Sequence, residues 1–216
     1  MLCLNSGSVN PDPRVVLHQV RALLFANLVR EGKTMMVLSV NISQPKPLTY
    51  QGQTVATGIF KTPVTGRVGV HRLGLEGDVQ VDRRVHGGVD KAVYIYPHEH
   101  YAHWETFLSR KDFAFGQFGE NLTTTGLLED HVRVGDKLRI GSVLLQVTQP
   151  REPCFKLMTK MNDFTFAKPF LTSGRTGFYL RVLEEGELGA GDAIERVATE
   201  PAAPTIRDVV EEMINQ

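Results

Sequence analysis

From residue 37 onward, short apolar runs are separated by glycine and proline, and this rhythm limits the fold more than any other feature. The runs have the length and composition of β-strands, and they cover residues 37–42, 92–96, 131–140, 142–149 and 177–183. The third and fourth runs meet at Gly141, which predicts a hairpin with a tight turn. Many short strands with few helices indicate a mainly β fold, either a β-barrel or a pair of packed sheets.

Two segments show helical periodicity instead. Residues 97–110 begin with proline and carry aromatic residues at helical spacing, which predicts an amphipathic helix. Residues 203–216 predict a second helix, with Thr205 as its N-cap and Asp208 as the acidic partner three residues later.

The chain divides by composition into three regions. Residues 1–35 contain an apolar stretch at 22–29 that is too short and too interrupted to span a bilayer, and no cleavage signal follows it. We interpret this region as an N-terminal arm, either helical or the product of an upstream start. Residues 36–198 form the predicted β domain, and residues 199–216 form a short C-terminal helical appendage.

Charge and cysteine content exclude several classes of protein. The 24 basic residues balance 24 acidic ones, so no overall field attracts a nucleic acid polymer or an anionic membrane. Any site for an anion must therefore be local. Cys3 and Cys154 are the two cysteines, too few for a disulfide framework and typical of a cytoplasmic protein.

The densest polar cluster lies within residues 76–96. Its glycine pair lets the backbone approach a ligand closely, and its cations and N–H groups suit a phosphate or another oxyanion. A charged surface hairpin explains the same pattern. The glycine-rich residues 115–127 form either a second wall of this pocket or a loop that connects two elements. The residues alone favour the connecting loop. The cluster consists of Arg83, Arg84, His86, Gly87, Gly88, Asp90 and Lys91.

Cys154 lies in the sequence PREPC at residues 150–154, where two prolines restrict the turn that presents it. Arg151 and Lys156 flank it, and positive neighbours favour the thiolate form of a cysteine. A thiolate there is a nucleophile, a persulfide carrier or a ligand to a soft metal. The alternative is a small buried residue with a packing role.

A zinc site and a Cys–His hydrolase are weaker interpretations. On a helix His98 and His100 lie about 200° apart, so they cannot share one ion. The remaining ligands near them are too few for a structural site. Pairing Cys154 with His86 as a hydrolase lacks the family-specific local sequences, so we rank it below a cofactor role.

Together these segments resemble the MOSC domain family, named for the C-terminal domain of molybdenum cofactor sulfurase. Their order and spacing are similar to the stand-alone bacterial branch typified by YiiM, over about residues 37–197. The specific signature is the pair of motifs RVHGGVDKA and QPREPC. The segments FGENLTTTGL and GRTGFYLRVL also resemble the family.

The resemblance implies a β-barrel-like fold and a molybdenum cofactor, the molybdopterin dithiolene that carries the metal and a terminal phosphate. Cys154 matches the family cysteine that is a thiolate ligand to molybdenum in related enzymes. His86 and Asp90 are the candidates for proton handling. The residues implied in cofactor binding are Lys61, Arg83, Arg84, His86, Gly87, Gly88, Lys91, Asn121, Thr123 and Arg175.

By this resemblance the protein is an oxidoreductase that reduces small N-hydroxylated compounds, such as N-hydroxylaminopurine-type bases, to amines. The sequence lacks flavin, haem and iron–sulfur motifs, so electrons must come from separate electron-transfer proteins. The alternatives are a sulfur carrier with a persulfide on Cys154, or a cofactor-storage module without turnover.

The C-terminal region is shorter than the three-helix appendage usual in this branch. The apolar face of its one predicted helix needs cover from the β domain, from the N-terminal arm, or from a second subunit in a homodimer. That face consists of Ile206, Val209, Val210 and Met213.

Overall fold

The structure, a computed structural model, describes residues 35–81 and 87–216. Residues 35–216 group into one compact unit. Residues 1–34 of the predicted arm at residues 1–35 lie outside the described residues, and so do three of the predicted site residues, Arg83, Arg84 and His86.

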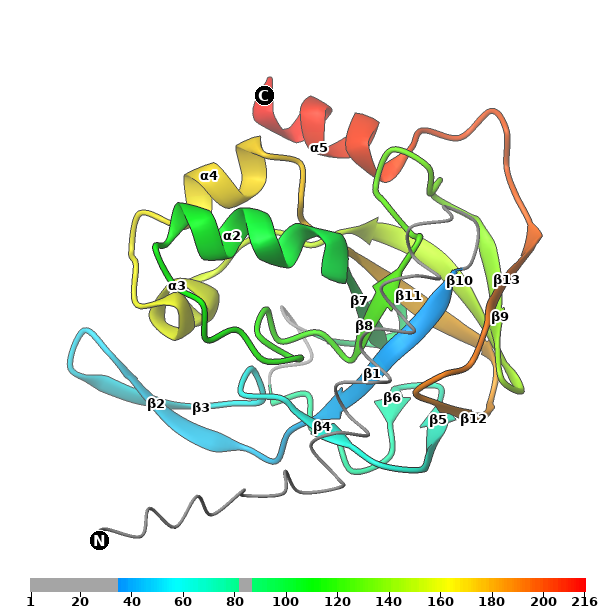
Figure 1. Cartoon of the computed structure of the whole chain (residues 1–216), viewed down its shortest axis with the longest axis horizontal. Coiled ribbons are helices and arrows are strands. Elements are labelled where there is room, and N and C mark those ends of the chain that lie inside the picture. Colours follow the sequence, from blue (N-terminus) through cyan, green and yellow to red (C-terminus); the bar gives the residue numbers. More distant parts are fainter. Residues whose placement is uncertain (1–34, 82–86) are drawn as a thin grey trace, which may run out of the picture. The chain divides into compact units, whose positions relative to one another are not determined.

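Eight strands form the main sheet, in the order β13-β9-β10-β11-β7-β8-β1-β4 (Figure 1). Neighbouring strands are antiparallel except for β7 and β8, which run parallel. The strands are β1 (Met36–Ile42), β4 (Thr62–Val64), β7 (Val93–Pro97), β8 (Leu122–Thr125), β9 (Lys137–Ile140), β10 (Val143–Pro150), β11 (Phe178–Glu184) and β13 (Ile194–Ala198).

The sheet curls until β1 meets the beginning of β13. Met36 forms an isolated bridge with Ala193, and the Val37 N–H donates to the Asp192 carbonyl at 3.0 Å. The prediction of a mainly β fold is therefore confirmed. Among the described residues, however, the sheet does not close into a barrel, because this contact is a single bridge and not a continuous ladder.

Two small sheets complete the β structure. One has the order β12-β5-β6, with β5 (Arg67–His71), β6 (Gly74–Leu75) and β12 (Gly186–Gly189). The other is a hairpin of β2 (Lys46–Tyr50) and β3 (Gln53–Thr57), which turns through Gln51 and Gly52. Both turn residues have positive φ, 48° and 76°, as a tight hairpin turn of the primed type requires.

Three short helices, α2, α3 and α4, gather on one side of the sheet (Figure 1). They pack around a second, aromatic core that includes Tyr96, Trp104, Phe118, Phe166 and Phe170. The helical elements are η1 (Val89–Lys91), η2 (His98–His100), α2 (Tyr101–Phe107), α3 (Phe155–Met161), α4 (Ala167–Thr172) and α5 (Ile206–Ile214).

The predicted elements are largely present, with shorter bounds. The hairpin at Gly141 is confirmed between β9 and β10, but the strand predicted from residue 131 begins only at Lys137. The helix predicted over 97–110 is η2 followed by α2. It ends at Phe107, and Ser109 beyond it has a φ of 52°. Helix α5 has the predicted capping box at Thr205.

The apolar face of α5 is covered partly by the same chain. Ile206 and Val210 are fully buried, and Ile206 belongs to the main core inside the curled sheet. The helix packs against β10 and α4. Whether the protein forms a homodimer remains a prediction.

Candidate functional site

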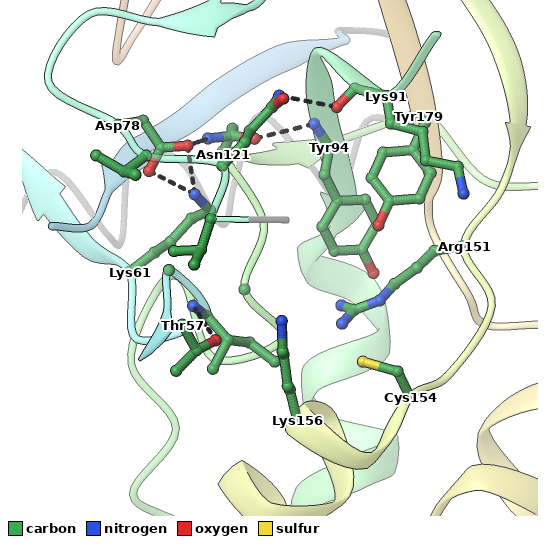
Figure 2. Close-up of a pocket in the computed structure, with 16 residues that line it drawn as sticks. Thr57, Lys61, Asp78, Lys91, Tyr94, Asn121, Arg151, Cys154, Lys156 and Tyr179 are labelled. Atoms are coloured by element: carbon green, nitrogen blue, oxygen red, sulfur yellow. Dashed lines mark hydrogen bonds and ion pairs between the residues drawn. The ribbon is translucent and has the colours of Figure 1, made fainter. Parts of the chain in front are cut away.

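A cleft of about 600 Å³, including space open to solvent, lies where β3, β7, β10 and β11 approach α3 (Figure 2). Its walls come from residues 57–61, residues 78–81 and residues 151–156 together with single residues from the sheet. Four of the predicted site residues line it, namely Lys61, Lys91, Asn121 and Cys154.

Cys154 stands between the end of β10 and the beginning of α3. Its backbone is extended, with φ −136° and ψ 167°, and its carbonyl accepts from Leu157 N at 2.9 Å and from Met158 N at 3.2 Å. The residue is half-buried. Its sulfur faces the cleft on the same side as Arg151 and Lys156 (Figure 2).

Arg151 is a buried cation beside this sulfur. It is 5% exposed, its Nη1 donates to the Phe118 carbonyl, and its guanidinium lies 4.8 Å from the Tyr94 ring centroid. It also interacts electrostatically with Cys154. Because a guanidinium keeps its proton in proteins, this wall of the cleft carries a permanent positive charge.

Lys156 and Lys91 add positive charge to the same cleft. The Lys156 side chain lines it and is largely buried. The Lys91 ammonium lies 5.8 Å from the Tyr179 ring centroid, on the opposite side from Lys156 in Figure 2. The cleft is therefore suited to an anionic ligand, although the chain as a whole has no net charge.

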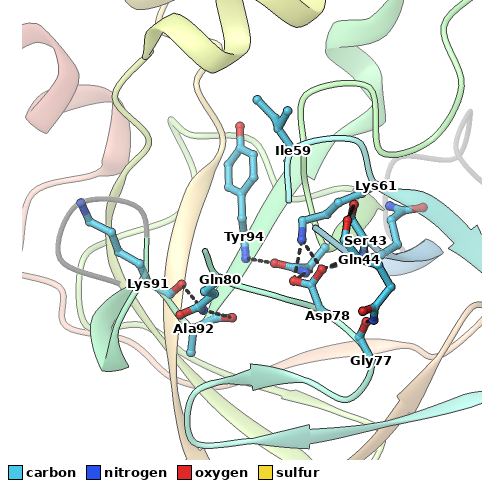
Figure 3. Close-up of polar contacts among 12 residues, drawn as sticks. Ser43, Gln44, Ile59, Lys61, Gly77, Asp78, Gln80, Lys91, Ala92 and Tyr94 are labelled. Carbon is cyan, nitrogen blue, oxygen red and sulfur yellow. Dashed lines mark hydrogen bonds and ion pairs between the residues drawn. The ribbon is translucent and has the colours of Figure 1, made fainter. Parts of the chain in front are cut away.

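Lys61 forms an ion pair with Asp78 in the floor of the cleft (Figures 2 and 3). Its Nζ donates to the two carboxylate oxygens at 2.6 and 2.5 Å, and Asn121 Nδ2 donates to Asp78 Oδ2 at 2.9 Å. The Ser43 N–H donates to Asp78 at 2.8 Å and the Tyr94 N–H to Asn121 Oδ1 at 3.1 Å. Burial lowers the pKa of Lys61, and Asp78 acts in the opposite direction.

Glu120 organises the loop behind the cleft. It is fully buried and accepts hydrogen bonds from the Tyr101 and Thr123 hydroxyls and from the backbone N–H groups of Gly116 and Phe118. The carbonyls of the same loop accept from Arg151 and from Lys160. Glu120 therefore holds the turn that fixes these cations. Burial lowers the pKa of Lys160 to about 8.

The predicted glycines lie beside the cleft, around Gln80. Gly88 has a φ of 93°, and its N–H donates to Gln80 Oε1 at 3.0 Å. Gln80 Nε2 donates to the carbonyls of Lys91 and Ala92 at 3.2 and 3.4 Å (Figure 3). A Cβ on Gly87 would collide with the Gln80 amide. The two glycines thus leave room for the Gln80 side chain, which hydrogen-bonds to the backbone of Gly88, Lys91 and Ala92.

Three other predicted residues do not line the cleft. Asp90 is exposed, and its carboxylate lies 3.1 Å from the Arg181 guanidinium. Thr123 is fully buried, and its hydroxyl bonds with Asn41 and Glu120. Arg175 lies in the turn between α4 and β11, where its carbonyl accepts from the Tyr96 hydroxyl.

Several cleft residues were not singled out from the sequence as site residues. The sequence identifies Arg151 and Lys156 only as cations next to Cys154, and this proximity is the pattern that indicates a role in the site. Tyr94 and Tyr179 lie in predicted strands, where the sequence pattern of a buried tyrosine indicates a residue of the hydrophobic core. Nothing in the sequence spacing marks Asp78 as the partner of Lys61.

The described residues contain neither a membrane-crossing helix nor a cluster of metal ligands. Across residues 35–81 and 87–216, no helix has the length and apolar character needed to cross a membrane. In the same residues, no group of three or more histidine, cysteine, aspartate or glutamate side chains could hold a metal ion.

Comparison with known proteins matches residues 82–195 to the MOSC domain family. The uncharacterized protein YflK of Bacillus subtilis is 46% identical over 159 residues, which cover 74% of this chain and 72% of YflK. A reductase of Gibberella moniliformis is 34% identical over 146 residues, 66% of this chain but 26% of the reductase. The crystal structure of YiiM from Geobacillus stearothermophilus superposes with a TM-score of 0.69 at 37% identity, over 83% of each chain. The chain belongs to the MOSC family and is similar to its stand-alone YiiM-like members.

Proposed function

We propose that the cleft binds a molybdenum cofactor and that the protein reduces small N-hydroxylated compounds to amines. Membership of the MOSC family and similarity to a protein named as a reductase support this proposal. The observation that carries it is the combination of the Cys154 sulfur with Lys91, Arg151 and Lys156 in one cleft.

The residues present fit the chemistry of this cofactor. A cysteine thiolate is a soft ligand of the kind that binds such a metal. The cofactor is anionic, and the cleft offers three cations in addition to Lys61, whose charge Asp78 offsets. The backbone around Gly58 and Gly119, which also lines the cleft, provides uncharged polar surface for a pterin ring.

The cofactor, when bound, supplies the two-electron redox chemistry. The net reaction converts R–NHOH, two electrons and two protons into R–NH2 and water. In this proposal Cys154 would hold the metal through its thiolate and would not attack the substrate. Tyr94 and Tyr179 form an aromatic wall that limits access of water. His86 is the proposed proton carrier, whereas Asp90 is committed to its ion pair with Arg181.

Electrons reach the site from separate electron-transfer proteins in this proposal. Among its described residues the chain has one cysteine and no cluster of metal-ligating side chains that could hold a second redox centre. In this proposal the protein takes its electrons from an external donor, which a chemical reductant can replace in an assay.

Metal analysis tests the proposal directly. Protein from a host with an intact cofactor pathway is analysed by mass spectrometry as wild type, Cys154→Ser and the control Cys3→Ser. We expect nearly one molybdenum per chain in the wild type and in Cys3→Ser, and its loss in Cys154→Ser. Loaded protein with a chemical reductant should then convert N-hydroxylaminopurine to the amine. Absence of molybdenum from all three proteins would refute the proposal.

A sulfur carrier is the second candidate function. Arg151 and Lys156 beside the Cys154 sulfur would stabilise the anion of a persulfide as well as a metal-bound thiolate. In that case the intact mass of the protein shows one additional sulfur atom on Cys154, which a reductant releases, and no molybdenum is bound.

A further inference from the structure

The β2–β3 hairpin is joined to the rest of the domain mainly at its two ends. Among the described residues its strands pair with each other and with no strand of the two other sheets, and it projects toward the side where α3 lies (Figure 1). Within the same part of the chain, no hydrogen bond or ion pair joins residues 46–56 to another element. An isolated two-stranded hairpin is marginally stable in water, so its position depends on its base and its tip.

The base of the hairpin is anchored at one wall of the cleft. Where the chain enters, the Ser43 N–H donates to Asp78 Oδ1 at 2.8 Å, and the Ser43 carbonyl accepts from Val79 N at 3.1 Å. Where the chain leaves, Gly58 packs so closely that a Cβ would lie 2.4 Å from the Val79 carbonyl oxygen. Thr57 and Gly58 both line the cleft. Any movement of the hairpin therefore pivots about this wall.

The tip of the hairpin is held by aromatic contact at the opposite wall. The ring centroid of Tyr50 lies 4.8 Å from that of Phe155, the first residue of α3, and 5.7 Å from that of Phe164 in the loop after α3. The Tyr50 hydroxyl accepts from Gln51 Nε2 within the turn at 3.2 Å, so the ring makes the contact with α3. Phe155 directly follows Cys154, which lines the cleft. The hairpin therefore joins the two walls.

The alternation of burial identifies the inner face of the hairpin. Leu48 is buried and Tyr50 and Val55 are half-buried, whereas Thr49 and Thr54 on the other face are exposed. The inner face packs against α3 through β2. Because none of these contacts is a hydrogen bond, lifting residues 46–56 from α3 leaves no buried polar group without its partner.

We propose that the β2–β3 hairpin is a flap at the entrance of the cleft and that the Tyr50 ring holds it closed on α3. The base stands on the wall formed by residues 57–61, and the tip rests beside Cys154 on the other wall. Ring contacts of this kind are weak enough to break and re-form, and segments with few attachments open locally. The flap opens to admit a large ligand and closes over it. It controls access to Cys154 for either candidate function.

The first test measures access to Cys154 in cofactor-free protein with Cys3→Ser, where Cys154 is the one remaining thiol. Labelling rates are compared for a small reagent, iodoacetamide, and a large one, fluorescein maleimide. Tyr50→Ala removes both ring contacts and should speed labelling by the large reagent about tenfold. The rate with iodoacetamide should change much less, because the half-buried thiol already admits a small molecule.

Two control variants accompany this measurement. Tyr50→Phe keeps the ring and should label as the wild type does. Phe107→Ala removes an aromatic side chain of α2 that is 49% exposed and lies outside the hairpin, and it should also label as the wild type does. Unchanged labelling of Tyr50→Ala by the large reagent would overturn the flap. Equal acceleration with both reagents would overturn it as well, since that result reports a change in the thiol itself.

Hydrogen exchange separates opening of the flap from a general loss of structure. A hairpin detached from α3 frays, so amide exchange of residues 46–57 should rise about tenfold in Tyr50→Ala. Exchange in β10 and β11 should stay at the wild-type rate, because these strands belong to the main sheet. Faster exchange throughout the domain would show that the Tyr50 ring stabilises the whole fold, and it would overturn the proposal.

Discussion

Replacing Glu120 with glutamine is the sharpest test of how the cleft is supported. The substitution preserves size and removes the negative charge of a side chain that is fully buried. Glu120 accepts four hydrogen bonds, three of them at Oε1 and one at Oε2 from the Phe118 N–H at 2.9 Å. Glutamine has one carbonyl oxygen and one amide group, so it cannot accept at both positions.

The magnitude follows from the best arrangement open to glutamine. Its oxygen takes the position of Oε1 and keeps three bonds, while its NH2 group faces the Phe118 N–H, donor against donor. The lost charge-assisted bond and the unsatisfied N–H together cost about 2–4 kcal/mol. For a domain of this size, that cost lowers the melting temperature by roughly 5–15 °C.

Urea unfolding followed by circular dichroism measures the difference in free energy. The matched control is Glu211→Gln on the exposed side of α5, which should remain within about 0.5 kcal/mol of the wild type. Because Phe118 and Gly116 also hold Arg151 and Lys160, we expect Glu120→Gln to retain less molybdenum as well. Wild-type stability in Glu120→Gln would show that the loop does not depend on this carboxylate.

Three further predictions concern stability. Thr205→Ala removes the capping box of α5 and should cost about 1 kcal/mol in urea unfolding, and an unchanged midpoint would contradict the capping role. Gly177→Ala should cost more than about 2 kcal/mol, because φ is +63° and the new Cβ would meet the Ile95 carbonyl; equal melting temperatures would count against this. Between about pH 8 and pH 10.5, the unfolded chain binds more protons at Lys160 than the folded chain, so stability rises with pH. The wild type should gain up to about 1.4 kcal/mol per pH unit over Lys160→Met, and parallel pH profiles would refute the shift.

The sequence was most informative where local rules decide the structure. Gly141 fixes a two-residue turn between β9 and β10, and Thr205 with Asp208 fixes the first turn of α5, so both were predictable from adjacent residues. The position of Cys154 after a strand, and directly after the two prolines Pro150 and Pro153, indicated a cleft-facing cysteine, although a packing role was the alternative.

Tertiary contacts decided the rest. Helix α3 has seven residues, too few for a clear period, and it is held by Leu157 and Met161 in the aromatic core. The four residues of β8 are all buried, so Leu122–Thr125 lacks the alternation of a half-exposed strand, and its threonines resemble a loop. The pairing of Lys61 with Asp78 joins residues 17 positions apart that no periodicity relates.

The bridge between β1 and the start of β13 also constrains the order in which the protein can fold. The Met35 carbonyl accepts from Ile194 N at 2.9 Å, and the Val37 carbonyl accepts from Gly191 N at 2.8 Å. Strand β1 pairs with β8 along one edge, but β4 covers only residues 40–42 of its other edge. During synthesis, the beginning of that second edge must therefore wait for residues about 155 positions later. Until then the backbone groups at the beginning of β1 stay unpaired on this edge, and such slow, nonlocal β pairing favours capture of the nascent chain by a chaperone.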